Sequence, residues 1–499
     1  MAARLPLLHK TPFVLDPRPL DEATSSHAGL LAISRAFRSL GLPALIEANL
    51  PLRKRESGFA EAQMIESICL LQILGGECPE DAHLLANDPC LERGLGYAPA
   101  KTTALRTFLE RFHDKELEKL RPDRQVQKSF IFPSSQPING LQQVQAGLVR
   151  RIAKLYAQAG QRQSIATVDQ DATIIESHKK AALYHYDGGR GYQPMVALWA
   201  ELDLVLADEF RDGNVPAKQD PLTCARLAFA ALPETITQRY FRGDSACHEN
   251  ELLQWLNHPE REKETGGKIS FAISAVMSEE LKAEMRKVKE SDWKTFATEQ
   301  DGTLRQWAEV PFVPGQKSES KNSQPWRYLG LRLLKPQGVL FADGTDRHFH
   351  AVITNNWKGE GARILEWHRE KAGTVEHTHD EVKNELAGGH VPSQRFGVNS
   401  AWFKMALFSY NLVSAIKGLC LEGEEQTARL KRFRLLVVHL AGRMNRNNCV
   451  MGLRLCQKAE AIKRLQKIWE VFELATQATA ATPLEKKEER KEQRKKRKT

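Results

Sequence analysis

Three acidic residues have the types and positions that metal-assisted phosphate chemistry requires. Asp171, in VDQDAT, and Asp244, after YFRG, lie in or at the end of short apolar runs typical of strands, whereas Glu376 lies in a charged helical stretch. Mg²⁺ takes oxygen ligands and keeps several waters, so a few carboxylates and substrate phosphates can hold two ions. Two such ions can stabilise the attacking and leaving oxygens of an in-line displacement. The three acids therefore predict a site for two Mg²⁺ ions, for which Mn²⁺ can substitute.

The residues around the acids leave one assignment open. Lys383 follows Glu376 by seven positions, so both lie on the same helical face. Asp169 and Asp171 are two positions apart on a strand and point to the same face, which makes Asp169 an alternative first acid. Any single acid, taken alone, is more typical of a solvated surface side chain, because the chain contains 62 Asp and Glu.

Longer stretches of sequence around these acids, taken in their order along the chain, indicate a family. They are SSHAGLLAISRAFRSLGL, GGECPEDAHLLANDPCLERGLGY, VDQDATIIESH, YDGGRGYQPMVALWAE, EFRDGNV, RGDSACHENELLQWL and VEHTHDEVKNELAGGHVPSQRFGVNSAWFKMALFSYNL. With them the chain resembles the DDE transposases of bacterial insertion sequences, in particular the group numbered thirteen-eighty, over most of its length.

The resemblance implies a fold and a set of catalytic residues. The fold is a ribonuclease H-like mixed sheet flanked by helices, an α/β architecture with a β-rich insertion and a helical N-terminal domain. The first acid lies on the first strand, the second after the fourth strand and the glutamate on a later helix. Asp171, Asp244 and Glu376 match these positions, and Asp171 is preferred to Asp169 because D-A-T matches the family pattern D-x-T.

The helix of the third acid departs from a signature of the wider group, in which a tyrosine and an arginine precede the glutamate and a lysine follows it. Lys383 matches the lysine, but Ala372 stands at the arginine position and Arg369 at the tyrosine position. Lys383 is therefore one candidate contact for a DNA phosphate, and Arg369 or Lys371 is a further candidate.

Further candidates come from loops and from the insertion. Arg190, in the glycine-rich segment YHYDGGRGYQP, could face a phosphate, although a plain hairpin explains the segment equally well. The resemblance implies that an aromatic side chain of the insertion stacks on a flipped base, with Trp293, Trp307 and Trp326 as candidates. Five histidines precede or surround Glu376 without a recognised zinc spacing, namely 348, 350, 368, 377 and 379.

Composition indicates a basic protein that binds polyanions. The 72 Lys and Arg exceed the acids and give a net charge of +10. About half of that excess lies in the tail EKKEERKEQRKKRKT, which is expected to be disordered, as a solubilising end or a non-specific DNA contact. Scattered cysteines without C-x-x-C pairs, and no apolar run of about 20 residues, predict a reduced, cytoplasmic protein without a membrane segment. The resemblance implies that this protein is bacterial and associated with the nucleoid.

Composition shifts along the 499 residues predict several domains. These are a helical N-terminal region at 1–120, a linker at 121–140, a first part of the core at 141–256, a β-rich insertion at 257–345, a second part of the core with C-terminal helices at 346–477, and the basic tail at 478–499. The resemblance implies that the N-terminal region binds DNA and that the core is catalytic.

The resulting hypothesis is a transposase that moves an insertion sequence by cut-and-paste. Cleavage at the terminal inverted repeats would leave a 3′ hydroxyl, which then attacks target DNA at the same site. The partner is double-stranded DNA, and the resemblance implies a homodimer on paired ends. Two alternatives stay open: an inactive descendant that only binds the repeats, and a metal nuclease that cleaves without strand transfer.

Overall fold

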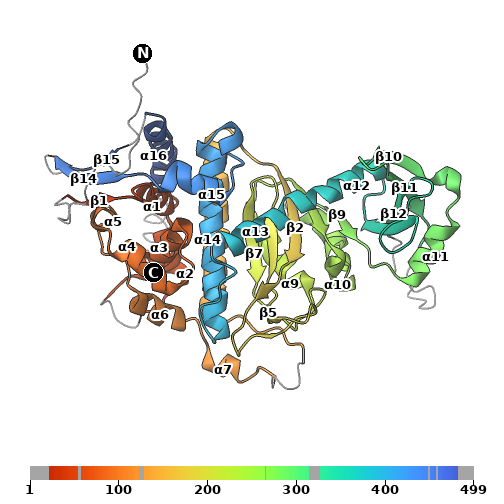
Figure 1. Ribbon diagram of the computed structural model, residues 1–499, viewed down its shortest axis with the longest axis horizontal. Helices are drawn as coiled ribbons and strands as arrows, with labels where there is room; N and C mark the ends of the chain where they lie inside the picture. Colours follow the sequence, from red (N-terminus) through yellow and green to blue (C-terminus); the bar gives the residue numbers. More distant parts are fainter. Residues whose placement is uncertain are drawn as a thin grey trace, which may run out of the picture.

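The fold is built around one large mixed sheet, seen in a computed structural model that describes residues 22–53, 58–122, 128–264, 266–313, 326–447, 450–456 and 459–480 (Figure 1). Its nine strands lie in the order β10-β11-β12-β13-β9-β8-β2-β6-β7. The five strands at one end form the core: β2 (Ile165–Ala172), β6 (Met195–Trp199), β7 (Leu204–Glu209), β8 (Gln238–Gly243) and β9 (Ile269–Ser274).

The core strands follow the predicted ribonuclease H-like topology. β2, β6 and β7 pair antiparallel, whereas β8 and β9 run parallel to β2. The first acid lies on the first of these strands and the second follows the fourth, as predicted. A small separate sheet, β3 (Ile175–Glu176), β4 (Leu183–Tyr184) and β5 (Arg190–Tyr192), follows β2 directly.

Helices cover the sheet and its free edge at β7. They are α8 (Gln136–Gln158), α9 (Pro221–Ala231), α10 (Asn250–Leu256), α12 (Gly361–Arg369), α13 (Val375–Asn384) and α14 (Phe396–Cys420). Amide side chains of α8 and α14 bond the β7 backbone: Gln145 donates to the Val205 carbonyl, and Asn411 bonds both the NH and the carbonyl of Val205. An unpaired edge strand leaves polar backbone groups without hydrogen-bond partners. These side-chain amides supply such partners to β7 in place of another strand.

The predicted insertion extends the central sheet as an antiparallel meander. It consists of β10 (Lys294–Thr298), β11 (Leu304–Val310), β12 (Arg327–Leu334) and β13 (Arg347–Thr354), after helix α11 (Glu279–Lys287). Only three residue pairs, such as Ile353 with Ile273, join β13 to β9. The boundaries differ from the predicted 257–345, because β9 pairs with β8 as a core strand and the meander ends at Thr354.

The N-terminal region is helical, as the spacing of apolar residues predicts. It contains α1 (Leu30–Ser39), α2 (Leu42–Asn49), α3 (Glu61–Leu74), α4 (His83–Ala86), α5 (Pro89–Leu95), α6 (Thr102–Glu110) and α7 (Lys115–Glu118). The long helix α14 runs between these helices and the sheet, in contact with α3 and β7 (Figure 1). Within the predicted linker, α8 begins at Gln136, where the Ser135 hydroxyl caps it.

The C-terminal segment packs on the N-terminal helices. Beyond α15 (Leu430–Phe433) and a π-helical turn (Arg434–Val438), the hairpin β14 (Gly442–Asn447) and β15 (Val450–Leu455) pairs with β1 (Thr24–Ser25), and α16 (Ala459–Ala480) packs on α1. The sequence analysis grouped these residues with the catalytic core. The basic tail from Glu485 lies outside the described residues. Of the helices described, none is long and apolar enough to cross a membrane.

Candidate active site

The first two predicted acids lie side by side at the ends of two neighbouring parallel strands. In the register of β2 and β8, Gln170 pairs with Gly243, so Asp171 and Asp244 are the next residues on each strand. Asp244 also caps a short 3-10 turn, where its Oδ1 accepts a hydrogen bond from the Ala246 NH at 3.1 Å. Burial, and then the neighbouring Asp171 carboxylate, raise the pKa of Asp244. The fold therefore places two carboxylates close enough to repel each other.

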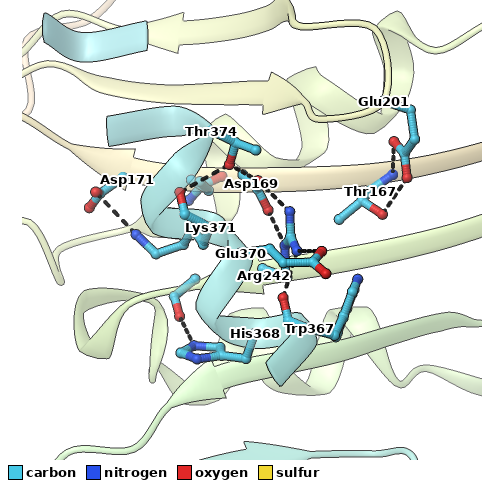
Figure 2. Close-up of polar contacts among 12 residues, drawn as sticks. Thr167, Asp169, Asp171, Glu201, Arg242, Trp367, His368, Glu370, Lys371 and Thr374 are labelled. Carbon is cyan, nitrogen blue, oxygen red and sulfur yellow. Dashed lines mark hydrogen bonds and ion pairs between the residues drawn. The ribbon is translucent and has the colours of Figure 1, made fainter. Parts of the chain in front are cut away.

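A buried lysine offsets part of the negative charge of this pair. The Lys371 Nζ lies 3.1 Å from Asp171 Oδ2, and the lysine is only 6% exposed (Figure 2). Burial lowers the pKa of Lys371, but Asp171 and Asp244 outweigh that effect, so the pKa rises above its usual value. Sequence analysis considered Lys371 only as a phosphate contact, because the 200 positions between it and Asp171 conceal the pairing.

Asp169, the alternative first acid, is fully engaged with other side chains (Figure 2). The Arg242 guanidinium donates to both carboxylate oxygens, at 2.6 and 2.8 Å, and the Thr374 hydroxyl also donates to Asp169. Asp169 is 0% exposed. Arg242 further donates to the Trp367 carbonyl at 2.6 Å and to Glu370 at 2.9 Å. This network fixes the connection between α12 and α13 to the sheet, and Arg242 is a residue that the sequence analysis missed.

Glu376, the third predicted acid, lies in the first turn of α13 and is exposed. Among the described residues, Glu376 does not form with Asp171 and Asp244 a group arranged to hold a metal ion. Helix α13 itself contacts β2, and seven positions after Glu376 the Lys383 Nζ donates to the Ile174 carbonyl at 3.2 Å. The helix thus lies over the strand of the first acid, and the Glu376 side chain is exposed in the first turn of this helix.

The histidines on α13 face different surroundings. His379 is buried, its Nε2 lacks a hydrogen-bond partner, and burial lowers its pKa to about 4, although Asp171 acts in the opposite direction. The His377 Nε2 lies 3.6 Å from the Glu381 Oε1, and Glu381 raises the pKa of His377. Elsewhere, the His368 Nε2 lies 3.0 Å from the Gly243 carbonyl oxygen. Across the described residues, no group of three or more His, Cys, Asp or Glu is arranged to hold a metal ion.

The other predicted DNA contacts lie at different depths. Arg369 is exposed at the end of α12, Lys383 is half-buried, and Lys371 is buried in its ion pair. Arg190 is exposed on the small sheet, where its guanidinium lies 4.7 Å from the centre of the Tyr184 ring. These contacts stay predictions.

The three candidate tryptophans all pack within the extended sheet. Trp293 is buried beneath the Arg332 guanidinium, Trp307 is buried, and the Trp326 ring lies 5.6 Å from that of Phe271. Trp357, in the turn after β13, is instead 58% exposed, and the sequence analysis did not single it out. Base stacking by any of them stays a prediction.

Comparison with known proteins covers nearly the whole described chain. The family described as "Transposase DDE domain group 1" matches residues 21–477. The chain belongs to this family of DDE transposases. A cryo-EM structure of the piggyBac transposase synaptic complex with hairpin DNA is similar, with a TM-score of 0.40 and 9% identity over 93% of this chain and 85% of that one. No curated protein matches this DDE transposase in sequence.

Proposed function

We propose that this DDE transposase moves an insertion sequence by cut-and-paste, cleaving DNA at terminal inverted repeats and joining the resulting 3′ hydroxyl to target DNA. The observation that carries the proposal is the adjacency of Asp171 and Asp244 on parallel strands. The family match over residues 21–477 supports the same chemistry. Cleavage and joining are one in-line phosphoryl transfer with different nucleophiles, so a single site suffices.

The carboxylate pair suits a divalent cation. Asp171 and Asp244 share the single positive charge of Lys371, and the proximity of Asp171 contributes to the raised pKa of Asp244. Oxygen donors of this kind are those that Mg²⁺ and Mn²⁺ prefer. We assign Asp171 and Asp244, with Glu376 as the third ligand, to hold two Mg²⁺ ions. Such ions would stabilise the charge on the attacking and leaving oxygens and activate water.

Other residues would position the DNA. Two cations can contact phosphate oxygens: Lys383, which donates to the Ile174 carbonyl just after β2, and Arg369, which is exposed at the end of α12. Asp169 and Arg242 would hold the strand and the α12–α13 connection in place without contacting DNA. We further propose that two copies act together on paired ends, in the cytoplasm of a bacterium.

Movement of a marked element tests the proposal. A selectable marker between the inverted repeats that flank the gene is followed for excision and reinsertion in cells, with wild type and Asp171→Asn, Asp244→Asn and Glu376→Gln variants that still bind the repeat. Asp380→Asn is the matched control, because Asp380 lies on the same helix and pairs with Arg429 at the surface. We expect movement with wild type and the control only.

Other outcomes point to the two alternatives. Repeat binding by wild type without cleavage would indicate an inactive descendant, and cleavage without a joined product would indicate a nuclease. Movement that survives Glu376→Gln would remove that residue from the ligand set.

A further inference from the structure

Lys371 occupies a place where a cation is needed. It lies on the 3-10 turn Glu370–Gly373, between α12 and α13, and its side chain reaches the ends of β2 and β8. Its Nζ contacts Asp171, and Asp244 acts on it electrostatically as well. Two poorly solvated carboxylates at adjacent strand ends repel each other unless a positive charge lies between them. In the chain without metal, the lysine provides that charge.

The backbone that carries Lys371 is held on both sides. Before it, Arg242 donates to the Trp367 carbonyl and to Glu370; after it, the Thr374 hydroxyl donates to the fully buried Asp169. The turn therefore cannot move away without breaking the hydrogen bonds that join it to Arg242 and Asp169. The four-carbon side chain of a lysine, by contrast, changes rotamer readily.

A divalent cation bound to the same carboxylate oxygens would meet the ammonium at close range. Like charges a few ångströms apart in a partly buried site repel strongly, since solvent screens them poorly. The two cations therefore compete for one site.

We propose that Lys371 is an internal counter-ion that the divalent cation must displace from Asp171, beside Asp244, so that the lysine sets the metal affinity of the free protein. This inference rests on the proposed role of those two acids as metal ligands. It makes Lys371 a positioning residue, which holds the acids together before metal arrives.

Mn²⁺ binding to the full-length protein without DNA tests the inference. Affinity is measured by calorimetry for wild type, Lys371→Met, Lys371→Arg and Lys383→Met. Lys383→Met is the matched control, since it removes a nearby charge that bonds the Ile174 carbonyl and pairs with neither acid. We expect Lys371→Met to bind Mn²⁺ at least about tenfold more tightly than wild type, and the other two to stay within roughly threefold of it. An affinity of Lys371→Met equal to or weaker than that of wild type would overturn the inference.

Thermal unfolding gives a second readout. In EDTA, Lys371→Met should melt below wild type, because the carboxylates then repel without a counter-ion, and Mn²⁺ should raise its melting temperature more than that of wild type. If Lys371→Met fails to fold, Lys371→Gln is measured in its place. Equal Mn²⁺-induced shifts in wild type and the variant would contradict the inference.

Asp244→Asn separates this inference from the proposed function. If Asp244→Asn weakens Mn²⁺ binding while Lys371→Met leaves it unchanged, the metal site stands and the counter-ion role fails. If wild type binds no Mn²⁺, or Asp244→Asn binds it as wild type does, both fail.

Discussion

At the scale of single residues, two aspartates two positions apart have different surroundings. Asp171 and Asp169 face the same side of β2, as their spacing predicts. Asp169 is enclosed by Arg242 and Thr374, whereas Asp171 remains partly open beside Lys371. The D-A-T pattern favours Asp171, and that choice stays a prediction. The pattern could not reveal that Asp169 is engaged, because the partners of Asp169 are distant along the chain.

Asp169→Asn should destabilise the fold strongly. It would leave the buried Arg242 without its full counter-charge, and removing one partner of a buried pair typically costs about 3–5 kcal/mol. Asp171→Asn should cost clearly less, because its side chain is partly exposed and an amide still accepts from Lys371. Urea denaturation of both variants measures the difference. Equal losses would show that Asp169 has no special structural role.

At the scale of elements, α14 connects the N-terminal helices to the sheet, in contact with α3 and β7. It is an almost wholly buried helix, and its Lys404 pairs with Asp208 of β7 and donates to Gln142 of α8 at 3.0 Å. Three elements therefore meet at one buried ammonium. The strands β6 and β7 and the helical character of α14 could be predicted from apolar spacing. The buried contact of Lys404 with Asp208 and Gln142 could not be predicted, because a lysine in an apolar segment indicates an exposed position.

Lys404→Met should lower the free energy of unfolding by about 3–5 kcal/mol, because the buried Asp208 loses its counter-ion. Lys282→Met serves as the control, since its pair with Glu279 is exposed and such pairs contribute about 0–1 kcal/mol. Chemical denaturation compares the two variants. A second change, Asp208→Leu, should restore part of the loss; no restoration would argue against the unpaired charge as the cause.

At the scale of the whole molecule, the first and last segments that the structure describes pack together. β1 pairs with β14, α1 packs on α16, and the His27 Nδ1 lies 3.2 Å from the His439 Nδ1. Sequence analysis placed the C-terminal segment with the core, because no local pattern indicates which distant helices it contacts. The same limit explains β9, whose alternating pattern fits a core strand as well as an insertion strand.

As the pH is lowered, the free energy of unfolding should decrease more steeply in wild type than in His439→Gln. Burial lowers the pKa of both histidines; Asp88 opposes this at His27, while His27 and Arg434 add to it at His439. The pKa values of both histidines in the folded protein therefore lie below the value of about 6.5 in the unfolded chain. The stability contributed by the neutral imidazoles is thus fully present above about pH 6.5 and is lost as the pH falls from there toward the folded pKa values. Denaturation at pH 7.5 and 5.5 measures it. An equal drop in both proteins would contradict the prediction.

The meander between the second acid and the third also affects how the protein folds. Asp244 and Glu376 are 132 positions apart, and closing so long a loop costs conformational entropy. Each meander strand pairs with its neighbour in the sequence, so these contacts are local and can form early. Once formed, they hold the start of β10 and the end of β13 at opposite edges of one compact four-stranded meander. The insertion thereby shortens the effective loop, and the catalytic edge of the sheet can assemble around a unit that is already folded.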